Sequence, residues 1–350
     1  MSPSVHWASL ATSSPMGQQH YESKIQEAMR RLASDGWHFA GTTVASLRAE
    51  MNVDVRLPMR LVSRAPAGVA ALAGRALYPR ADLMHRFDLR VPPGRLPEVV
   101  TVHDLPPARF ADEGSLPRFA IRSARRAAGV ICPSRFAEEE IRQLCGVERI
   151  WVIPYGLSEE FRRPSPLAEA ELAGLGVTGR YVVHAAGATT RKNLAALADA
   201  WRMLASRHPD VMLVLCGPPD RRRTDLFSAL PRVAMPGRLP PLTVAGLMAG
   251  AAAVAVPSTY EGFGLPALEG MAAGAPVVAA RAGALPEVCG EAARLVEPTG
   301  EGLAEGLDDV LSDPDEADRL AAPGRERAMA FDWATAARAH LQVYQEILGS

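Results

Sequence analysis

The sequence predicts an α/β protein built from two doubly wound domains, each a parallel sheet covered by helices. Short apolar runs alternate with helical stretches along most of the chain, which is typical of parallel strands joined by helices. The 350 residues are enough for two domains, and the alternation lapses once, between Pro154 and Pro166. We therefore expect an N-terminal domain over 1–158, a C-terminal domain over 159–330 and a final segment over 331–350.

In the N-terminal half, short runs rich in valine and isoleucine are expected to be strands, because β-branched residues suit a buried sheet. The expected strands are 5–10, 99–102, 129–133 and 150–153, and the expected helices are 19–34, 118–128 and one that begins after Ser134. Ser134 is the expected N-cap of that last helix, with Glu138 and Glu140 near its positive end.

In the C-terminal half the same alternation resumes and is more regular. The expected strands are 181–185, 211–216, 252–256 and 277–280, and the expected helices are 193–206, 243–251, 266–273, 285–289, 303–311, 315–322 and 333–348. Asp313-Pro314-Asp315 could be read as a metal-binding Asp-x-Asp, but it lies between two expected helices, where we interpret it as a cap. The last helix is long and amphipathic.

The composition is that of an ordinary soluble globular protein. Apolar residues make up 48% and charged residues 22%, and the net charge of −1 gives no argument for nucleic-acid binding. The four cysteines have no metal-ligand spacing, so we expect buried thiols in a reducing cytoplasm. The N-terminus has no signal-peptide pattern, and no apolar run reaches the roughly 18 residues that a spanning helix needs.

The most informative stretch runs from Glu261 to Glu269 and reads Glu-Gly-Phe-Gly-Leu-Pro-Ala-Leu-Glu. Pro266 suits the first turn of a helix that Gly274 would end. The backbone N–H groups of Phe263, Gly264 and Leu265 would then lie at the positive end of this helix, which favours an anion. A carboxylate on each side suits a ligand that is both phosphorylated and rich in hydroxyls, such as a sugar nucleotide.

Other polar motifs also follow expected strands, and the carboxyl ends of parallel strands are where such sheets bind ligands. The motifs are Gly17, His103-Asp104, Gly187 with Arg191-Lys192-Asn193, and Gly217. Three of them have a structural alternative: Gly17 could serve a simple turn, Asp104 could cap the next segment beside a core His103, and Asn193 could cap a helix. No Gly-x-Gly-x-x-Gly follows a strand and no P-loop motif occurs, which argues against nicotinamide and P-loop enzymes.

Residues 257–278 resemble the retaining family-four glycosyltransferases (glycosyl transferases group 1), in particular their mannosyltransferase-like branch. Their hallmark is two glutamates separated by seven residues, and Arg191-Lys192-Asn193 and 284–288 match the family as well. Three departures stand out. Tyr155 replaces an asparagine of the family's linker signature, Gly17-Gln18 stands where relatives have a Gly-Gly pair, and the turn before Arg191 lacks the arginine that many relatives carry.

The resemblance implies the GT-B fold, in which two Rossmann-like domains face each other across a cleft and the last helix crosses back to the N-terminal domain. It implies that Glu261 contacts the transferred sugar and steadies positive charge at its anomeric carbon. The other residues in catalysis would be His103, Lys192 and Arg191. The donor-binding residues would be Glu269 at the ribose, Phe263, Gly264, Leu265, Gly17, Gly187 and Gly217, with Asp104 on the acceptor side. No metal or cofactor is implied.

The expected function is retaining, metal-independent transfer of a hexose from a nucleotide sugar, with GDP-mannose as the first candidate donor, in glycoconjugate or cell-envelope biosynthesis. A sugar-nucleotide epimerase on the same fold and a non-catalytic partner subunit that binds nucleotide sugars remain alternatives. Between Arg56 and Arg95 the chain carries eight arginines against two aspartates, interleaved with apolar residues. This stretch could be a solvated helical face, bind a phosphorylated or lipid-linked acceptor, or touch the inner face of a membrane.

Overall fold

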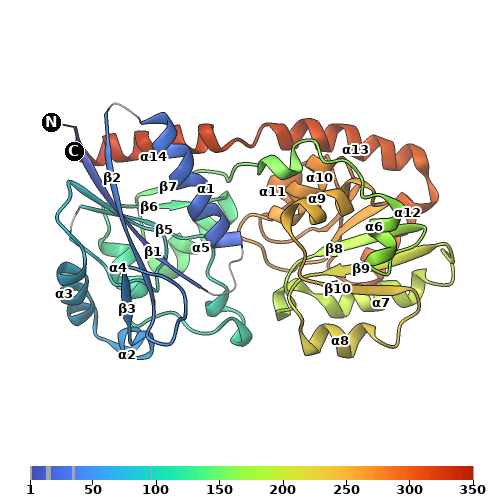
Figure 1. Ribbon diagram of the computed structural model, residues 1–350, viewed down its shortest axis with the longest axis horizontal. Coiled ribbons are helices and arrows are strands. Elements are labelled where there is room, and N and C mark those ends of the chain that lie inside the picture. The colour runs from blue at the N-terminus through green and yellow to red at the C-terminus, as the bar shows by residue number, and fades with distance from the viewer. Residues whose placement is uncertain (1, 13–16, 34–35, 96, 350) are drawn as a thin grey trace. The chain divides into compact units, whose positions relative to one another are not determined.

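The computed structural model describes residues 2–12, 17–33, 36–95 and 97–349. It divides into two compact units (Figure 1). The first is Met1–Gly156 together with Asp332–Ser350, and the second is Leu157–Phe331. The first break thus falls inside the stretch where the sequence pattern lapses, and the second falls just before the last helix.

The first unit contains a seven-stranded sheet in the order β3-β2-β1-β4-β5-β6-β7. Its strands are β1 (Ser4–Leu10), β2 (His38–Ser46), β3 (Val55–Leu57), β4 (Leu83–Arg86), β5 (Glu98–Thr101), β6 (Gly129–Cys132) and β7 (Ile150–Val152). All strand pairs among the described residues are parallel. Because β1 lies between β2 and β4, the strand order reverses there, and such switch points are where doubly wound sheets bind ligands.

The helices of the first unit are α1 (Gly17–Leu32), α2 (Met59–Arg64), α3 (Ala67–Leu77), α4 (Ala120–Arg126), α5 (Arg135–Cys145) and α14 (Trp333–Leu348). The expected cap of α5 is confirmed, since Ser134 Oγ accepts the N–H of Ala137 at 3.1 Å. The last helix, α14, packs on α1, the red and blue helices at the chain ends in Figure 1.

The second unit contains a six-stranded parallel sheet in the order β10-β9-β8-β11-β12-β13. Its strands are β8 (Arg180–Ala185), β9 (Val211–Cys216), β10 (Val233–Gly237), β11 (Ala253–Val256), β12 (Val277–Ala280) and β13 (Arg294–Val296). Its helices are α6 (Glu169–Gly174), α7 (Leu194–Leu204), α8 (Arg221–Phe227), α9 (Pro241–Ala249), α10 (Leu265–Ala273), α11 (Leu285–Cys289), α12 (Gly300–Ser312) and α13 (Pro314–Met329). Here the strand order reverses at β8, between β9 and β11.

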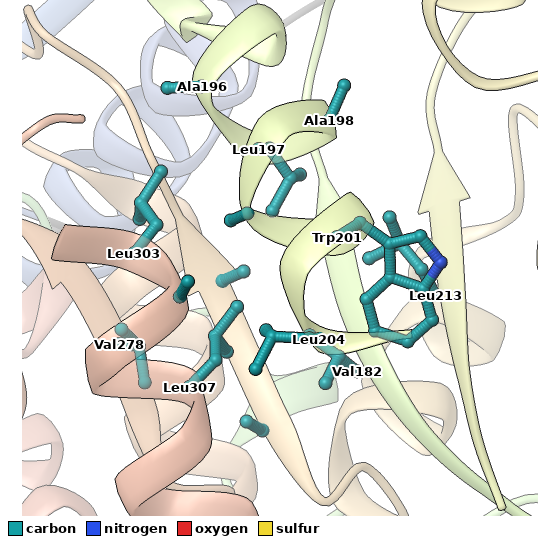
Figure 2. Packing of buried hydrophobic residues seen from close by; sticks show 14 of the residues in the cluster. Val182, Ala196, Leu197, Ala198, Trp201, Leu204, Leu213, Val278, Leu303 and Leu307 are labelled. Atoms are coloured by element: carbon teal, nitrogen blue, oxygen red, sulfur yellow. The ribbon is translucent and has the colours of Figure 1, made fainter. Parts of the chain in front are cut away.

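The core of the second unit lies where α7 and α12 pack together over the sheet. Figure 2 shows Trp201 and Leu204 of α7 with Leu303 and Leu307 of α12, beside Val182, Leu213 and Val278 of the strands; all of these are buried. The helices are therefore anchored against the same strands, β8 and β9, whose carboxyl ends lead into the candidate site. Burial of a large apolar side chain is worth roughly 1.5–3 kcal/mol, so this packing fixes the strand ends firmly.

Several elements were not expected from the sequence. Strand β4 carries His85 and Arg86, yet both are fully buried, because Arg86 Nε and Nη2 donate to Glu98 Oε1 at 3.2 and 2.9 Å. Helix α13 also continues past Pro323, where the sequence predicted an end. There Gly324 packs closely on α10, since an added Cβ would lie 3.3 Å from Met271 Cγ.

Candidate functional site

One group of predicted site residues lies at the switch point of the second sheet. The turn after β8 contains the short 3₁₀ helix η4 (Thr190–Lys192), and the segment after the neighbouring strand β11 leads to Glu261. The two segments are about 70 residues apart in sequence, but adjacent parallel strands bring their carboxyl ends together. Arg191, Lys192 and Glu261, which the sequence analysis singled out separately, are therefore in contact.

Glu261 is held by two cationic side chains. Lys192 Nζ donates to Glu261 Oε1 at 2.6 Å, and Arg191 Nη1 donates to Oε2 at 3.1 Å. Lys192 is 7% and Glu261 6% exposed, so this ion pair is buried. Burial alone would raise the pKa of Glu261, but Lys192 and then Arg191 outweigh it and hold that pKa below its usual value. Glu261 is therefore ionised at neutral pH.

The backbone around Glu261 is fixed by a glycine that the sequence analysis did not single out. The N–H of Ala284 donates to the Glu261 carbonyl oxygen at 3.0 Å. Gly283, just before it, has φ +58°, and a Cβ there would lie 2.7 Å from Glu261 N. Only glycine fits this position without moving Glu261. The signal available was its place directly before the family-like segment 284–288.

Asn193 does not cap a helix with its side chain, as the structural alternative supposed. It adopts a left-handed conformation with φ +54°. Its Nδ2 donates to the carbonyl oxygens of Pro257 and Pro298, at 3.0 and 2.9 Å. Because Pro257 begins the segment that leads to Glu261, Asn193 ties the turn that carries Lys192 to the segment that carries its partner.

The expected anion site is an ordinary helix start. Gly264 is the N-cap of α10 with φ +108°, Pro266 lies in the first turn and Gly274 ends the helix with φ +80°. A Cβ on Gly264 would lie 2.8 Å from Leu285 Cδ2, so the turn also packs tightly on α11. Phe263 is buried edge-to-face against Phe331, with ring centroids 5.6 Å apart. The first-turn amides thus lie on a rigid turn next to Glu261 in sequence.

Glu269 lies on the same helix in a different electrostatic environment. Its side chain is half-buried, and burial, followed by the nearby carboxyl of Glu160, raises its pKa to about 8. Glu160 belongs to the short 3₁₀ helix η3 (Glu159–Phe161), and its Oε2 is buried with no hydrogen-bond partner among the described residues. Glu269 therefore carries a proton at neutral pH, whereas Glu261 does not. The sequence analysis missed Glu160, which lies in no motif.

The loops that follow β8 and β9 pack closely against each other beside the turn that carries Lys192. Gly217 has φ +143°, and a Cβ there would lie 2.1 Å from the Ala186 carbonyl oxygen. That oxygen accepts from Arg223 Nη2 at 2.6 Å, and Arg223 Nη1 donates to Pro218 O at 2.8 Å. Arg223 is buried, and burial lowers its pKa. It joins the ends of β8 and β9, while Gly187 lies half-buried in the turn between Ala186 and Lys192.

A further arginine lies over this turn. Arg222 Nη1 donates to Ala188 O at 3.1 Å and to Thr190 Oγ1 at 3.0 Å. It comes from α8 and is exposed. Many family members carry an arginine within this turn, and here a side chain from another segment brings a guanidinium to the same turn. The run Arg221–Arg223 after the N-cap Asp220 was the only sequence signal for it.

The remaining predicted site residues belong to the first unit. His103 and Asp104 follow β5, and both are half-buried. His103 Nδ1 lies 2.5 Å from Tyr155 Oη, while its Nε2 is buried with no hydrogen-bond partner among the described residues. Gly17 is the exposed first residue of α1. The residues before it, 13–16, lie outside the described part of the chain.

The predicted cap at Asp313 and the predicted burial of the cysteines can be checked directly. Asp313 is the N-cap of α13, since its Oδ1 accepts the N–H of Asp315 at 3.0 Å, and the four cysteines are free and buried, as expected. Within the described ranges, no group of three or more His, Cys, Asp or Glu side chains could hold a metal ion. None of the helices described is long and apolar enough to span a bilayer.

The basic stretch needs a correction. Arg86 is buried against Glu98, and Arg90 Nη2 pairs with Asp88 Oδ2 at 2.6 Å, so neither adds to a surface charge in the way the sequence count assumed. The exposed arginines of this stretch are Arg56, Arg60, Arg64, Arg75, Arg80, Arg90 and Arg95, and of these Arg90 is the one neutralised by Asp88. Around α2 and α3 they are accompanied by Leu61 and Leu72, which are 69% and 65% exposed.

Comparison with known proteins agrees with this geometry. Residues 173–327 match the model of the glycosyl transferases group 1, and residues 46–161 match the model of glycosyltransferase family 4. An α-maltose-1-phosphate synthase of Mycolicibacterium smegmatis is 29% identical over 72% of this chain and 73% of its own length. A GDP-mannose-dependent α-(1-6)-phosphatidylinositol dimannoside mannosyltransferase of Mycobacterium tuberculosis is 30% identical over 67% of this chain, but only 64% of its own length is covered.

The fold has solved counterparts. HepE of Anabaena, crystallised with UDP-glucose, superposes with a TM-score of 0.76 at 22% identity, covering 97% of this chain and 99% of that one. Both family models, the relatives and the architecture of two parallel-sheet units agree with the resemblance seen in 257–278. The chain therefore carries a glycosyl transferases group 1 domain and a glycosyltransferase family 4 domain over these residues, and its two parallel-sheet units have the fold of the GT-B glycosyltransferases.

Proposed function

We propose that this protein transfers a hexose from a nucleoside diphosphate sugar to an acceptor hydroxyl with retention of the anomeric configuration. The observation that supports it most directly is the buried contact of Glu261 with Lys192 and Arg191. Two cations at the start of a helix suit a diphosphate leaving group, and an ionised carboxylate beside them suits a sugar that develops positive charge. This is the chemistry that glycosyl transfer requires.

The proposed roles follow from the charge states. The guanidinium fork of Arg191 and the ammonium of Lys192 stabilise the departing diphosphate together with the α10 amides, and the mechanism invokes no metal. Because Glu261 is ionised, it accepts hydrogen bonds from hydroxyl groups of the hexose and stabilises the positive charge that develops at the anomeric carbon. The acceptor attacks from the side of the leaving group, and the departing phosphate takes its proton. Glu269 binds the ribose hydroxyls.

We propose GDP-mannose as the first donor candidate, which the GDP-mannose dependence of the Mycobacterium tuberculosis relative supports. UDP-glucose is the second, because HepE was crystallised with it. The acceptor is proposed to be lipid-linked or phosphorylated, since the same relative is named for phosphatidylinositol dimannoside. The proposed diphosphate contacts of Arg191 and Lys192 involve groups that all nucleotide sugars share, so the donor panel described below separates the two candidates.

We also propose peripheral contact with the cytoplasmic face of an anionic membrane through α2 and α3. The exposed Leu61, Val69 and Leu72 lie among arginines, a combination that suits anionic headgroups over an acyl boundary. Co-sedimentation with vesicles of phosphatidylglycerol and phosphatidylcholine tests it. Leu61→Asp is expected to weaken binding several-fold, whereas Leu242→Asp in the second unit, 71% exposed, is the matched control. Equal binding to pure phosphatidylcholine would contradict the proposal.

The transfer itself is tested with a donor panel of GDP-mannose, UDP-glucose, ADP-glucose and UDP-N-acetylglucosamine, with and without EDTA. We expect hydrolysis or transfer of one donor, undiminished by EDTA, and an α-configured product by proton NMR from an α-configured donor. Glu261→Gln is the matched inactive control. A product formed from donor alone by epimerisation, or tight nucleotide binding without any turnover, would favour the alternative functions.

A further inference from the structure

His184 lies at the point where strands β8 and β11 of the second sheet separate. The parallel ladder between these two strands ends with the pair Val183 and Val254. In the same register the next pair would be His184 with Ala255, and there the imidazole Nδ1 lies 2.9 Å from the Ala255 carbonyl oxygen. A side-chain hydrogen bond therefore takes the place of the next rung of the sheet, directly before the loops that lead to the candidate site.

This hydrogen bond fixes the tautomer of His184. A carbonyl oxygen can only accept, so Nδ1 carries the proton and donates it to Ala255. Burial lowers the pKa of His184 to about 4, although the bond to Ala255 opposes this effect, so the ring is neutral at pH 7. In a neutral ring that is protonated on Nδ1, the Nε2 atom has a lone pair and is a hydrogen-bond acceptor.

The acceptor nitrogen of His184 has no donor. The residue is 1% exposed, and its Nε2 is buried with no hydrogen-bond partner among the residues that the structure describes. Buried polar atoms are nearly always hydrogen-bonded, because leaving one unpaired costs free energy that water would otherwise supply. An acceptor that stays unpaired in this state of the protein is therefore expected to be paired in another, by a group that carries an N–H or an O–H.

Lys192 is the ionised neighbour of His184 that is able to supply such a donor. The charges of Lys192, Arg223 and Glu261 all act on the His184 ring, so the three groups lie near it. The guanidinium of Arg223 is held by two backbone carbonyl oxygens, at 2.6 and 2.8 Å, and the ionised Glu261 has no proton to donate. The Lys192 ammonium has three N–H groups, and within the described chain its Nζ donates only to Glu261.

Binding of a diphosphate changes what Lys192 needs from the protein. Once the ammonium donates to phosphate oxygens, a carboxylate as its protein-side partner would repel the ligand that it binds. An uncharged acceptor can hold the ammonium in place without this repulsion. The neutral ring of His184 has this property, and Glu261 does not.

We propose that His184 is a positioning residue of the transfer reaction, whose Nε2 accepts an N–H of Lys192 when a diphosphate draws this ammonium away from Glu261. The inference rests on the proposed function for the identity of the anion. The tautomer of His184 and its ability to accept from Lys192 do not depend on any donor sugar.

The first measurement is a long-range ¹H–¹⁵N correlation spectrum of the full chain labelled at histidine, with His184 assigned by the loss of its signals in His184→Asn. His340 is an internal reference, because its Nδ1 also contacts a backbone carbonyl oxygen, at 2.8 Å, but its Nε2 already lies 2.7 Å from Tyr21 Oη. We expect the Nδ1–H pattern for both histidines. Inorganic pyrophosphate should move the His184 Nε2 resonance upfield, toward the hydrogen-bonded reference, in the native chain but not in Lys192→Met.

Two variants complete this experiment. Glu261→Met removes the oxygens that Lys192 contacts, so the same upfield shift should appear without pyrophosphate. Ser258→Ala removes a fully buried hydroxyl beside Glu261, the competing donor, and should keep the response. The proposal is overturned by a native His184 that is protonated on Nε2, by an Nε2 resonance that changes neither with pyrophosphate nor in Glu261→Met, or by a response that depends on Ser258 instead of Lys192.

The second measurement is the affinity for GDP and UDP by calorimetry. His184→Asn keeps an amide N–H for the Ala255 carbonyl and removes Nε2, so we expect about tenfold weaker binding of the nucleotide that the native chain prefers. His208→Asn is the matched control, because His208 is also buried in the second unit but precedes β9, at the amino end of the strand, and its Nε2 lies 2.8 Å from Asp308 Oδ1. Equal losses of affinity in both variants, or a lower Tm without a loss of affinity, would mean a merely structural role. If neither nucleotide binds the native chain, the proposed function fails, while the spectrum of Glu261→Met still decides whether His184 accepts from Lys192.

Discussion

Replacing Glu261 by glutamine keeps the side-chain shape and removes the carboxylate that Lys192 and Arg191 contact at 2.6 and 3.1 Å. Removing one partner of a buried ion pair typically costs about 3–5 kcal/mol, because a charge remains buried without its counter-ion. We expect the low end, about 3 kcal/mol, since a glutamine oxygen still accepts one hydrogen bond. At roughly 2–4 °C per kcal/mol, the Tm of the unit should fall by about 6–12 °C.

A double-mutant cycle separates the pair from its surroundings. Lys192→Met should destabilise the protein as well, but Lys192→Met with Glu261→Gln should cost about 2 kcal/mol less than the sum of the single changes. The matched control is the Arg202–Asp199 pair, which is equally short at 2.5 Å but has side chains 50% and 57% exposed. Its coupling energy should not exceed about 0.5 kcal/mol. Measurement is by urea unfolding and thermal denaturation at pH 7.

The same variants can also be compared by how much a bound nucleotide raises their Tm. In the native chain a diphosphate has to share Lys192 and Arg191 with Glu261, whereas in Glu261→Gln the ligand becomes the main anion beside them. Saturating nucleoside diphosphate should therefore raise the Tm of Glu261→Gln more than that of the native chain, while turnover falls. A Tm within 1–2 °C of native for Glu261→Gln, or strict additivity in the cycle, would refute the reasoning, since it would mean that the buried contact carries no stabilising interaction.

Three further predictions concern other charged groups. Glu269→Ala should weaken nucleotide binding about tenfold by calorimetry, whereas equal losses of binding in Glu269→Ala and Glu261→Gln would remove the division of roles between these two acids. Arg222→Ala should weaken donor binding several-fold, and Arg221→Ala, whose exposed side chain pairs with Asp225, should not; the two affinities are compared by titration. Burial and then Asp88 raise the pKa of Glu22 to about 8. Between about pH 4.5 and 8 the native state therefore holds a proton that the unfolded chain has released, so the free energy of unfolding falls as the pH rises through this range. Glu22→Gln should therefore gain about 1–3 kcal/mol over the native chain between pH 5.5 and 8, and a pH-independent difference in urea unfolding would contradict this.

The sequence predicted the strands made of contiguous β-branched residues, because a parallel strand that is buried on both faces is a continuous apolar run in the sequence. It did not predict β4, because that strand buries polar side chains whose partners are far away. His85 Nδ1 bonds to Tyr344 Oη on α14, and His85 Nε2 bonds to Thr101 Oγ1 at 2.8 Å. A buried histidine is satisfied only once the whole first unit has assembled, so no local pattern indicates it.

The residues of the candidate site likewise divide into those that the sequence predicted and those that it did not. Lys192 and Glu261 were identified separately by their motifs, and the order of strands around β8 explains why they meet. Arg222 and Glu160 were missed, since each reaches its place from a segment without a motif. Tyr155 was noted as a departure from the family signature and interpreted as a hinge residue. Its contact with His103 depends on the distance between two loops of the first sheet, which the sequence does not encode locally.

The charge states of Glu261 and Glu269 suggest how donor binding proceeds in this protein. The two acids lie eight positions apart, yet the pKa of Glu261 is held low by cations, while that of Glu269 is raised to about 8 by burial and Glu160. A diphosphate that takes over Lys192 and Arg191 releases oxygens of Glu261 from those cations, and the released oxygens can then accept hexose hydroxyls. The same exchange raises the pKa of Glu261, because its counter-ions now face a stronger anion. We therefore propose that donor binding in this unit exchanges one anion for another and frees the carboxylate oxygens of Glu261 for the sugar.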